Sequence, residues 1–290
     1  MRSLIAAALF LPALVVSSSA FAITVTSEAK SGPESITATP DGGVILGSAT
    51  SPRVFRAAKG ETQAKVFIDA ASTGATMFLG VLADGPSNTL WACQLQAVPG
   101  TNNRKSTLRS FDLTSGAPKT SWVLPGENNT CNDIAIGPDK AAYASDTAGA
   151  KIYRVKPGAS EGELVLENQR LLNGIDGLAF MGGVLYVNNV ASNQIYRIPM
   201  DASGKADDPV QIWTDQPIKG PDGMRASADR LFISENRNGR ASMLTINGDI
   251  AHVTVVKEGL TQTTALDVQG DTLWVSDRAN DNVVTIPLPH

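Results

Sequence analysis

Short apolar runs, broken by turn residues, recur along the whole chain and predict β-strands. Residues 175–200 read IDGLAFMGGVLYVNNVASNQIYRIPM, which is three β-prone runs separated by Gly-Gly and by a polar segment. Hairpins need such breaks, because Gly, Asn and Asp adopt the backbone conformations of tight turns. Aligned on the first run, the pattern starts again at or near Glu34, Phe78, Asn132, Asp176, Asp222 and Thr264.

The spacing and content of these units predict a β-propeller. Their starts lie 42 to 54 residues apart, close to the period typical of propellers and solenoids. A fourth apolar run closes each of the first five units: AKVFIDA, TSWVLPG, GELVLEN, VQIWTD and HVTVVKE. We therefore expect an all-β fold, a six-bladed β-propeller with four antiparallel strands per blade, in a single domain over residues 23–290.

The last unit lacks a fourth run, since the chain stops at VVTIPLPH. The missing strand is available at the other end, where the β-prone segment ITVTSEA occupies residues 23–29. Its pairing onto the last blade would close the ring and remove an exposed sheet edge. We expect the N-terminal strand of the mature chain to do this.

Residues 1–22, MRSLIAAALFLPALVVSSSAFA, have the layout of a signal peptide: one basic residue, a short apolar run and a small-residue cleavage site. The apolar run is too short to span a bilayer. Removal of Arg2 changes the net charge from −4 to −5, because 23 basic residues then face 28 acidic ones. We expect an exported protein, periplasmic or secreted and monomeric, with neither nucleic acid nor membrane as a partner.

Acidic residues begin several of the repeats and point to a metal site. First strands of a propeller line its channel and start at the same end, so their first residues form a ring at one mouth. Glu34, Asp176 and Asp222 would repel one another there unless a cation lay between them. Oxygen ligands of this kind suit Ca²⁺, with Zn²⁺ or Mg²⁺ as alternatives. The other interpretation is that these acids only cap turns, and Asn173 rivals Asp176 as the ligand if the register shifts.

The sequence resembles the SMP-30/gluconolactonase/LRE-like family of six-bladed propellers along the whole mature chain. The motifs that carry the resemblance are PES at the first unit, CNDIAIGPD at the third, DGLAF with LYV at the fourth and GPDGM at the fifth. Members bind one divalent cation at the channel mouth, usually calcium or zinc, and many hydrolyse lactones.

The resemblance implies roles for particular residues. Glu34 matches the metal-binding Glu, Asp222 the metal-binding Asp, and Asn132 an Asn that contacts the substrate or the metal-bound water. Asp176 stands where the family more often has Asn, and Thr130 replaces an Arg. These departures put the sugar-lactone specificity of the better-known members in question.

The implied function is metal-dependent hydrolysis of a lactone or related ester, with Asp222 or Asp176 as the catalytic base. The small-molecule substrate itself is not identified by any motif. His252 and His290 are the only histidines, which argues against Ser-His-Asp catalysis. The alternative is a non-catalytic propeller that binds a small ligand or a protein and keeps a structural Ca²⁺.

Cys93 and Cys131 are the only cysteines. Cys93 is expected to end a second strand, and Cys131 to precede the next first strand, so both thiols should lie at one mouth on neighbouring blades. An exported chain can oxidise them. We predict a disulfide that closes a loop of roughly 38 residues and stabilises the fold by about 3–4 kcal/mol.

Overall fold

The computed structural model describes residues 24–201 and 203–288. The predicted signal peptide, residues 1–22, lies outside this range. No helix of the described part is both long and apolar enough to cross a membrane. Its helical content is three short 3₁₀ turns: η1 (Ala71–Thr73), η2 (Gly85–Ser87) and η3 (Arg278–Asn280).

Consecutive strands pair antiparallel in runs of four. The first two runs are β2 (Pro33–Ala38), β3 (Val44–Ser48), β4 (Arg53–Ala57), β5 (Lys65–Asp69), and β6 (Met77–Asp84), β7 (Thr89–Ala97), β8 (Arg104–Asp112), β9 (Pro118–Val123). The next two are β10 (Cys131–Ile136), β11 (Ala142–Asp146), β12 (Lys151–Val155), β13 (Glu163–Glu167), and β14 (Ile175–Met181), β15 (Val184–Asn189), β16 (Gln194–Ile198), β17 (Val210–Thr214).

The remaining strands complete the arrangement. They are β18 (Pro221–Ser227), β19 (Arg230–Glu235), β20 (Arg240–Asn247), β21 (Ile250–Lys257), followed by β22 (Leu266–Gln269), β23 (Thr272–Asp277), β24 (Asn282–Pro287). The N-terminal β1 (Thr24–Thr26) pairs antiparallel with β24, with Val25 opposite Val283. The all-β class predicted from the sequence is confirmed.

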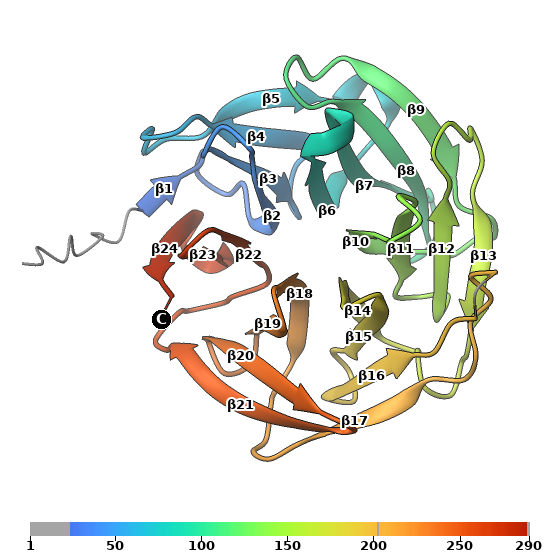
Figure 1. Cartoon of the computed structure of the whole chain (residues 1–290). Helices are drawn as coiled ribbons and strands as arrows, with labels where there is room; N and C mark the ends of the chain where they lie inside the picture. The colour runs from blue at the N-terminus through green and yellow to red at the C-terminus, as the bar shows by residue number, and fades with distance from the viewer. Residues whose placement is uncertain (1–23, 202, 289–290) are drawn as a thin grey trace, which may run out of the picture.

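The sheets are arranged as a ring (Figure 1). The strands β2, β6, β10, β14, β18 and β22 lie nearest the centre, and later strands of each run lie further out. The N- and C-terminal strands meet, since β1 lies beside β24 (Figure 1). The innermost strands therefore line the central channel, and their first residues lie at one end of it.

The core consists of buried clusters that each join two neighbouring sheets. One cluster packs Tyr143 and Ile152 of the β10–β13 sheet against Leu178 and Tyr196 of the β14–β17 sheet. Strand residues alternate between the two faces of a sheet, so each blade supplies apolar side chains to both neighbours. This packing fixes the innermost strands relative to one another, and with them the residues at the channel mouth.

The predicted disulfide is present and joins Cys93 to Cys131, with their Cα atoms 5.3 Å apart. One detail of the prediction was wrong. Cys93 lies in the middle of β7, which continues to Ala97 because it forms a long hairpin with β8, and Cys131 is already the first residue of β10. The bond links the second strand of one sheet to the innermost strand of the next.

Candidate functional site

Four residues of the predicted ring line one small cavity at the channel mouth. Glu34, Asn132, Asp176 and Asp222 surround a space of about 10 Å³, with Thr264 beside them. That volume corresponds to about one water-sized sphere. Asn173, the rival of Asp176, is exposed and does not line the cavity. We call this set of four residues the acidic mouth.

The residues of the acidic mouth sit on irregularities of the innermost strands. Each of β2, β10, β14 and β18 has a shift in its pairing register with the next strand. The shift always falls at the mouth residue and the residue after it, which are positions 34–35, 132–133, 176–177 and 222–223. A β-bulge redirects a side chain that would otherwise continue the regular alternation. The bulges turn these polar side chains toward the channel.

The glycine that follows each Asp allows the innermost strands to approach closely. A Cβ on Gly177 would collide with the carbonyl oxygen of Asp222, and one on Gly223 would lie 2.8 Å from the carbonyl oxygen of Thr264. Side chains larger than hydrogen do not fit there. The Asp-Gly pairs of the sequence therefore bring the carboxylates of neighbouring blades together.

Polar residues of the second strands hold the bulged backbone. The Ser145 hydroxyl donates to the carbonyl oxygen of Asp176 at 2.6 Å, across to the next sheet. The Asn188 amide donates to the carbonyl oxygen of Asp222 at 2.5 Å, and its oxygen accepts from the N–H of Gly177 at 2.9 Å. These bonds satisfy backbone groups that the bulges leave without strand partners.

Burial and mutual repulsion dominate the electrostatics of the acidic mouth. The pKa of Asp176 is raised well above its usual value, first by burial and then by the negative charges of Glu34 and Asp133. The pKa of Asp222 is raised well above its usual value by burial and by the charges of Asp176 and Glu34. Each carboxylate accepts one amide hydrogen bond, Asp176 from Asn132 and Asp222 from Asn236, and these bonds lower the two pKa values but do not outweigh burial and repulsion.

Arg278, which sequence reasoning missed, forms an ion pair with Glu34 at the edge of the acidic mouth. Its guanidinium Nη1 lies 2.6 Å from a carboxylate oxygen of Glu34. Burial raises the pKa of Glu34, while the Arg278 charge acts in the opposite direction. Arg278 thus already offsets part of the negative charge.

Position in the repeat could have revealed Arg278. Thr147, Asn236 and Arg278 each directly follow the second strand of their sheet. All three bond to the acidic mouth: Asn132 donates to the Thr147 hydroxyl at 3.0 Å, and Asn236 donates to Asp222 at 3.1 Å. Second strands end at the mouth where first strands begin, so the next residue in each repeat is placed to reach the channel.

Asn132 is engaged as a donor. Its side-chain nitrogen donates to Thr147 and, at 2.8 Å, to a carboxylate oxygen of Asp176. An Asn side chain has two N–H donors and one acceptor oxygen. With both donors used, the oxygen is the group that Asn132 can still offer to a substrate hydroxyl or a cation.

The donor chemistry fits a hard divalent cation. Two Asp, one Glu and one Asn present oxygen atoms, the ligands that Ca²⁺ takes in flexible geometry. In the described part of the chain, however, no three His, Cys, Asp or Glu side chains are gathered as a metal-binding group. Glu34 is paired with Arg278 instead.

A buried ion pair lies below the acidic mouth. Arg225 donates from one nitrogen to both carboxylate oxygens of Asp133 at 2.9 Å, and both side chains are less than 10% exposed. Asp267 lies near enough that its charge, with that of Asp133, raises the pKa of Arg225 against the effect of burial. Asp133 adjoins Asn132, so this pair anchors the strand that carries the mouth residue.

Several solved structures share this fold. The chain is similar to a putative gluconolactonase with a TM-score of 0.69 and 18% identity, over 93% of this chain and 95% of the other. A gluconolactonase from Xanthomonas campestris gives a TM-score of 0.66 and 15% identity, over 90% and 88% of the two chains. Virginiamycin B lyase from Staphylococcus aureus gives 0.63 and 13%, over 93% and 99%.

At these identities the likeness shows the fold alone, a β-propeller, and the same fold is shared by proteins named as gluconolactonases and as a lyase. The sequence matches no protein-family model and no curated protein. Function must therefore be argued from the acidic mouth itself.

Proposed function

We propose that this protein is a divalent-metal-dependent hydrolase that opens a lactone or a related ester at the acidic mouth. The observation that carries the proposal is the convergence of Glu34, Asp176 and Asp222 on a cavity of about 10 Å³. Gluconolactonases are among the proteins of the same fold.

Glu34, Asp176 and Asp222 would hold the cation, which the all-oxygen ligand set indicates is Ca²⁺, with Asn132 as a further oxygen donor. The raised pKa values of both Asp residues support this: burial raises them first and the neighbouring negative charges second, and a bound cation would offset both effects. Bound there, the ion supplies Lewis acidity toward an ester carbonyl.

The chain's own residues would supply the rest of the reaction. Asp222 takes the proton from the attacking water, since burial makes its carboxylate a stronger base than an exposed one. Asn236 orients that carboxylate by donating to it. Asn132 positions the substrate through its free amide oxygen. Arg278 supplies a positively charged side chain at the mouth, where the resembling family has an Arg at the position of Thr130.

The proposal is tested by assaying γ-, δ- and aromatic lactones with chelator and then with added Ca²⁺. We expect hydrolysis that chelator abolishes and Ca²⁺ restores. Asp222→Asn, assayed at saturating Ca²⁺, should lower the rate by about 10²–10⁴. Asp176→Asn, which places the family's usual residue, should keep activity. Exposed Asp208→Asn is the matched control. Absence of metal-dependent hydrolysis across the whole panel would overturn the proposal.

A non-catalytic binding propeller is the second candidate, favoured by the small volume of the mouth cavity, about that of one water-sized sphere, which suits a structural ion. In that case the same lactone panel would give no turnover, while a small ligand would still protect the protein against heat.

We also propose that the runs of four strands form six blades, closed by the pairing of β1 with β24, and that the chain is exported as a monomer. The strand pairings support the first point. The Cys93–Cys131 disulfide is weakly consistent with an oxidising compartment.

A further inference from the structure

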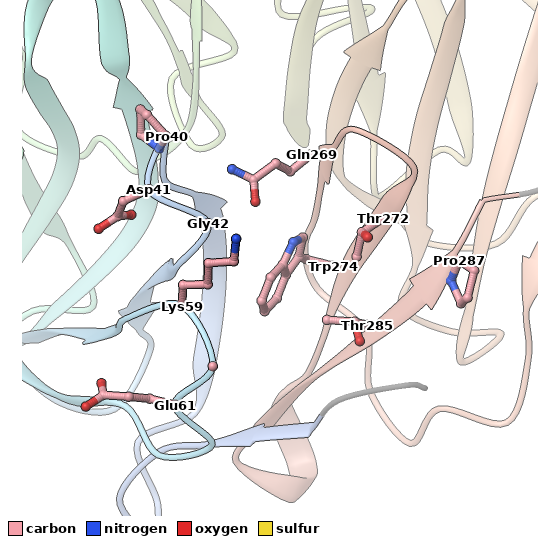
Figure 2. A pocket seen from close by; sticks show the side chains of 11 residues that line it. Pro40, Asp41, Gly42, Lys59, Glu61, Gln269, Thr272, Trp274, Thr285 and Pro287 are labelled. Atoms are coloured by element: carbon pink, nitrogen blue, oxygen red, sulfur yellow. The ribbon is translucent and has the colours of Figure 1, made fainter. Parts of the chain in front are cut away.

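A cleft of about 440 Å³ lies between the β2–β5 sheet and the sheet of β22–β24, where the first and last parts of the ring meet. Its walls come from the turn after β2, the β4–β5 turn and the ends of β22, β23 and β24, so it opens on the face opposite the acidic mouth. The side chains that matter are Lys59, Gln269, Thr272, Trp274 and Thr285 (Figure 2). We call it the junction cleft.

Lys59 brings an uncompensated positive charge to the junction cleft. The acids of the lining have other partners: Asp41 pairs with Arg56 at 2.8 Å and Glu61 with Lys65 at 3.0 Å. Figure 2 shows the Lys59 ammonium extending into the cleft. Its stem rests on Gly42, where a Cβ would lie 3.0 Å from the Lys59 Cδ. The glycine thus gives the lysine its path into the cleft.

Trp274 adds a buried donor without a partner, and Gln269 adds an acceptor. Trp274 is only 9% exposed, and its indole N–H is buried without a partner. Buried donors in native proteins are normally paired with protein, water or ligand. The Gln269 amide nitrogen donates to the carbonyl oxygen of Thr39 at 2.5 Å, which leaves its oxygen as an acceptor. Figure 2 shows this amide on the same side of the cleft as the indole.

The side chains that line the junction cleft indicate which class of ligand it could bind. An ammonium without a carboxylate partner favours an anion, and charge-assisted bonds of this kind are the strong ones. The Gln269 amide oxygen and the Thr272 hydroxyl suit a ligand with several hydroxyl groups. The indole and Pro287 supply the apolar surface on which the ring of such a ligand packs. The volume lies within the usual range of small-molecule sites, about 300–1,000 Å³.

We propose that the junction cleft binds a small hydroxylated ring acid of monosaccharide size, with its carboxylate at Lys59 and its ring against Trp274. The ligand touches both the first and the last sheet of the ring. Its binding therefore holds the two ends of the ring together and raises the melting temperature by mass action.

The test is calorimetric titration and thermal shift with D-glucuronate as the probe and D-glucose as its neutral counterpart. We expect glucuronate to bind and to raise the melting temperature, and glucose to bind more weakly. Lys59→Met keeps the stem over Gly42 and should weaken glucuronate binding about tenfold, as expected for loss of a charge-assisted bond. Trp274→Phe should weaken it as well.

Two controls separate this site from general effects. Lys257→Met removes an exposed lysine of β21 and should leave binding unchanged. Asp222→Asn should also leave it unchanged, because the acidic mouth is at the other end of the channel. Failure of the parent to bind glucuronate, or equal binding by the parent and Lys59→Met, would overturn the proposal. Loss of binding in Asp222→Asn would place the ligand at the acidic mouth and overturn it too.

Discussion

At the scale of single residues, the fold holds the carboxylates of the acidic mouth close together although they repel one another. Asp176 and Asp222 are 6% and 8% exposed. Both follow a buried strand residue and precede a glycine that has no room for a side chain. They cannot move apart without disrupting the close approach of the innermost strands. Their repulsion must therefore be relieved by a proton, by Arg278 or by a cation.

The first prediction at this scale concerns pH in the metal-free protein. The folded-state pKa values of Asp176 and Asp222 are raised, so folding favours their protonated forms. Stability from these groups is fully present below the unfolded pKa, near 4, and is lost as pH rises through the folded values. With chelator present, the contribution of these groups to the melting temperature should therefore fall as pH rises above the unfolded pKa and through the raised folded values. Saturating Ca²⁺ should reduce that fall, and Asp222→Asn should reduce it without Ca²⁺. A melting temperature independent of pH would contradict the assignment.

The second concerns the pairing of Arg278 with Glu34. Arg278→Met leaves a largely buried carboxylate without its partner, which should cost about 1–3 kcal/mol of unfolding free energy. Adding Glu34→Gln removes the stranded charge and should recover much of that loss. Urea denaturation of the parent, the single variants and the double variant forms a cycle. Additive effects of the two substitutions would show that the pair makes no net contribution.

At the scale of strands and turns, the Cys93–Cys131 bond is a local reinforcement that can be removed cleanly. It closes a loop of 38 residues between β7 and β10. By the loop-entropy relation, its loss should destabilise the protein by about 3–4 kcal/mol. We expect Cys93→Ala with Cys131→Ala to melt well below the oxidised parent, and a reductant to lower the melting temperature of the parent but not of the variant. Equal melting temperatures with and without the bond would refute this.

Much of this element scale could be predicted from the sequence. The runs AKVFIDA and GELVLEN coincide with β5 and β13, because β-rich segments between turn residues have few other stable arrangements. The bulges that hold Glu34 and Asp176 could not be predicted. They depend on contacts with the neighbouring sheet, such as the bond from Ser145 to Asp176, which period-2 alternation does not encode.

The same limit applied to Arg278. Its role depends on the end of a second strand lying beside the start of a first strand from another repeat, 244 residues away in sequence. An alignment of the first strands is enough to locate Glu34, Asn132, Asp176 and Asp222, but it does not reach the residues that follow the second strands. Asn173 was a plausible rival only because the register of β14 could not be set to one residue from its sequence.

At the scale of the whole molecule, β1 connects the two ends of the chain. Val25 is 1% exposed and packs in a cluster with Ile36 of β2 and Trp274 of β23. The backbone N–H of Thr26 donates to the carbonyl oxygen of Thr62 at 2.9 Å, which ties β1 to the first sheet. The strand thus contacts both sides of the junction.

If β1 closes the ring, a charge at its buried position should open it. Val25→Asp should lower the melting temperature strongly, because it places an unpaired carboxylate in an apolar cluster. Thr24→Asp, at the exposed neighbouring position, is the matched control and should change it little. Hydrogen exchange should show faster exchange in β24 for Val25→Asp. Similar stability of the two variants would mean that β1 does not contribute to closure.

The metal site at the acidic mouth is tested by calorimetric titration of Ca²⁺ into the chelator-treated protein at neutral pH. We expect one ion to bind per chain and the melting temperature to rise. By mass action, a hundredfold excess of Ca²⁺ over the dissociation constant should stabilise the folded state by about 2.7 kcal/mol. Asp222→Asn should weaken or abolish the binding, and Asp208→Asn should not. Absence of Ca²⁺ binding to the parent, or binding that survives the loss of Glu34, Asp176 and Asp222 together, would contradict a metal site at the acidic mouth.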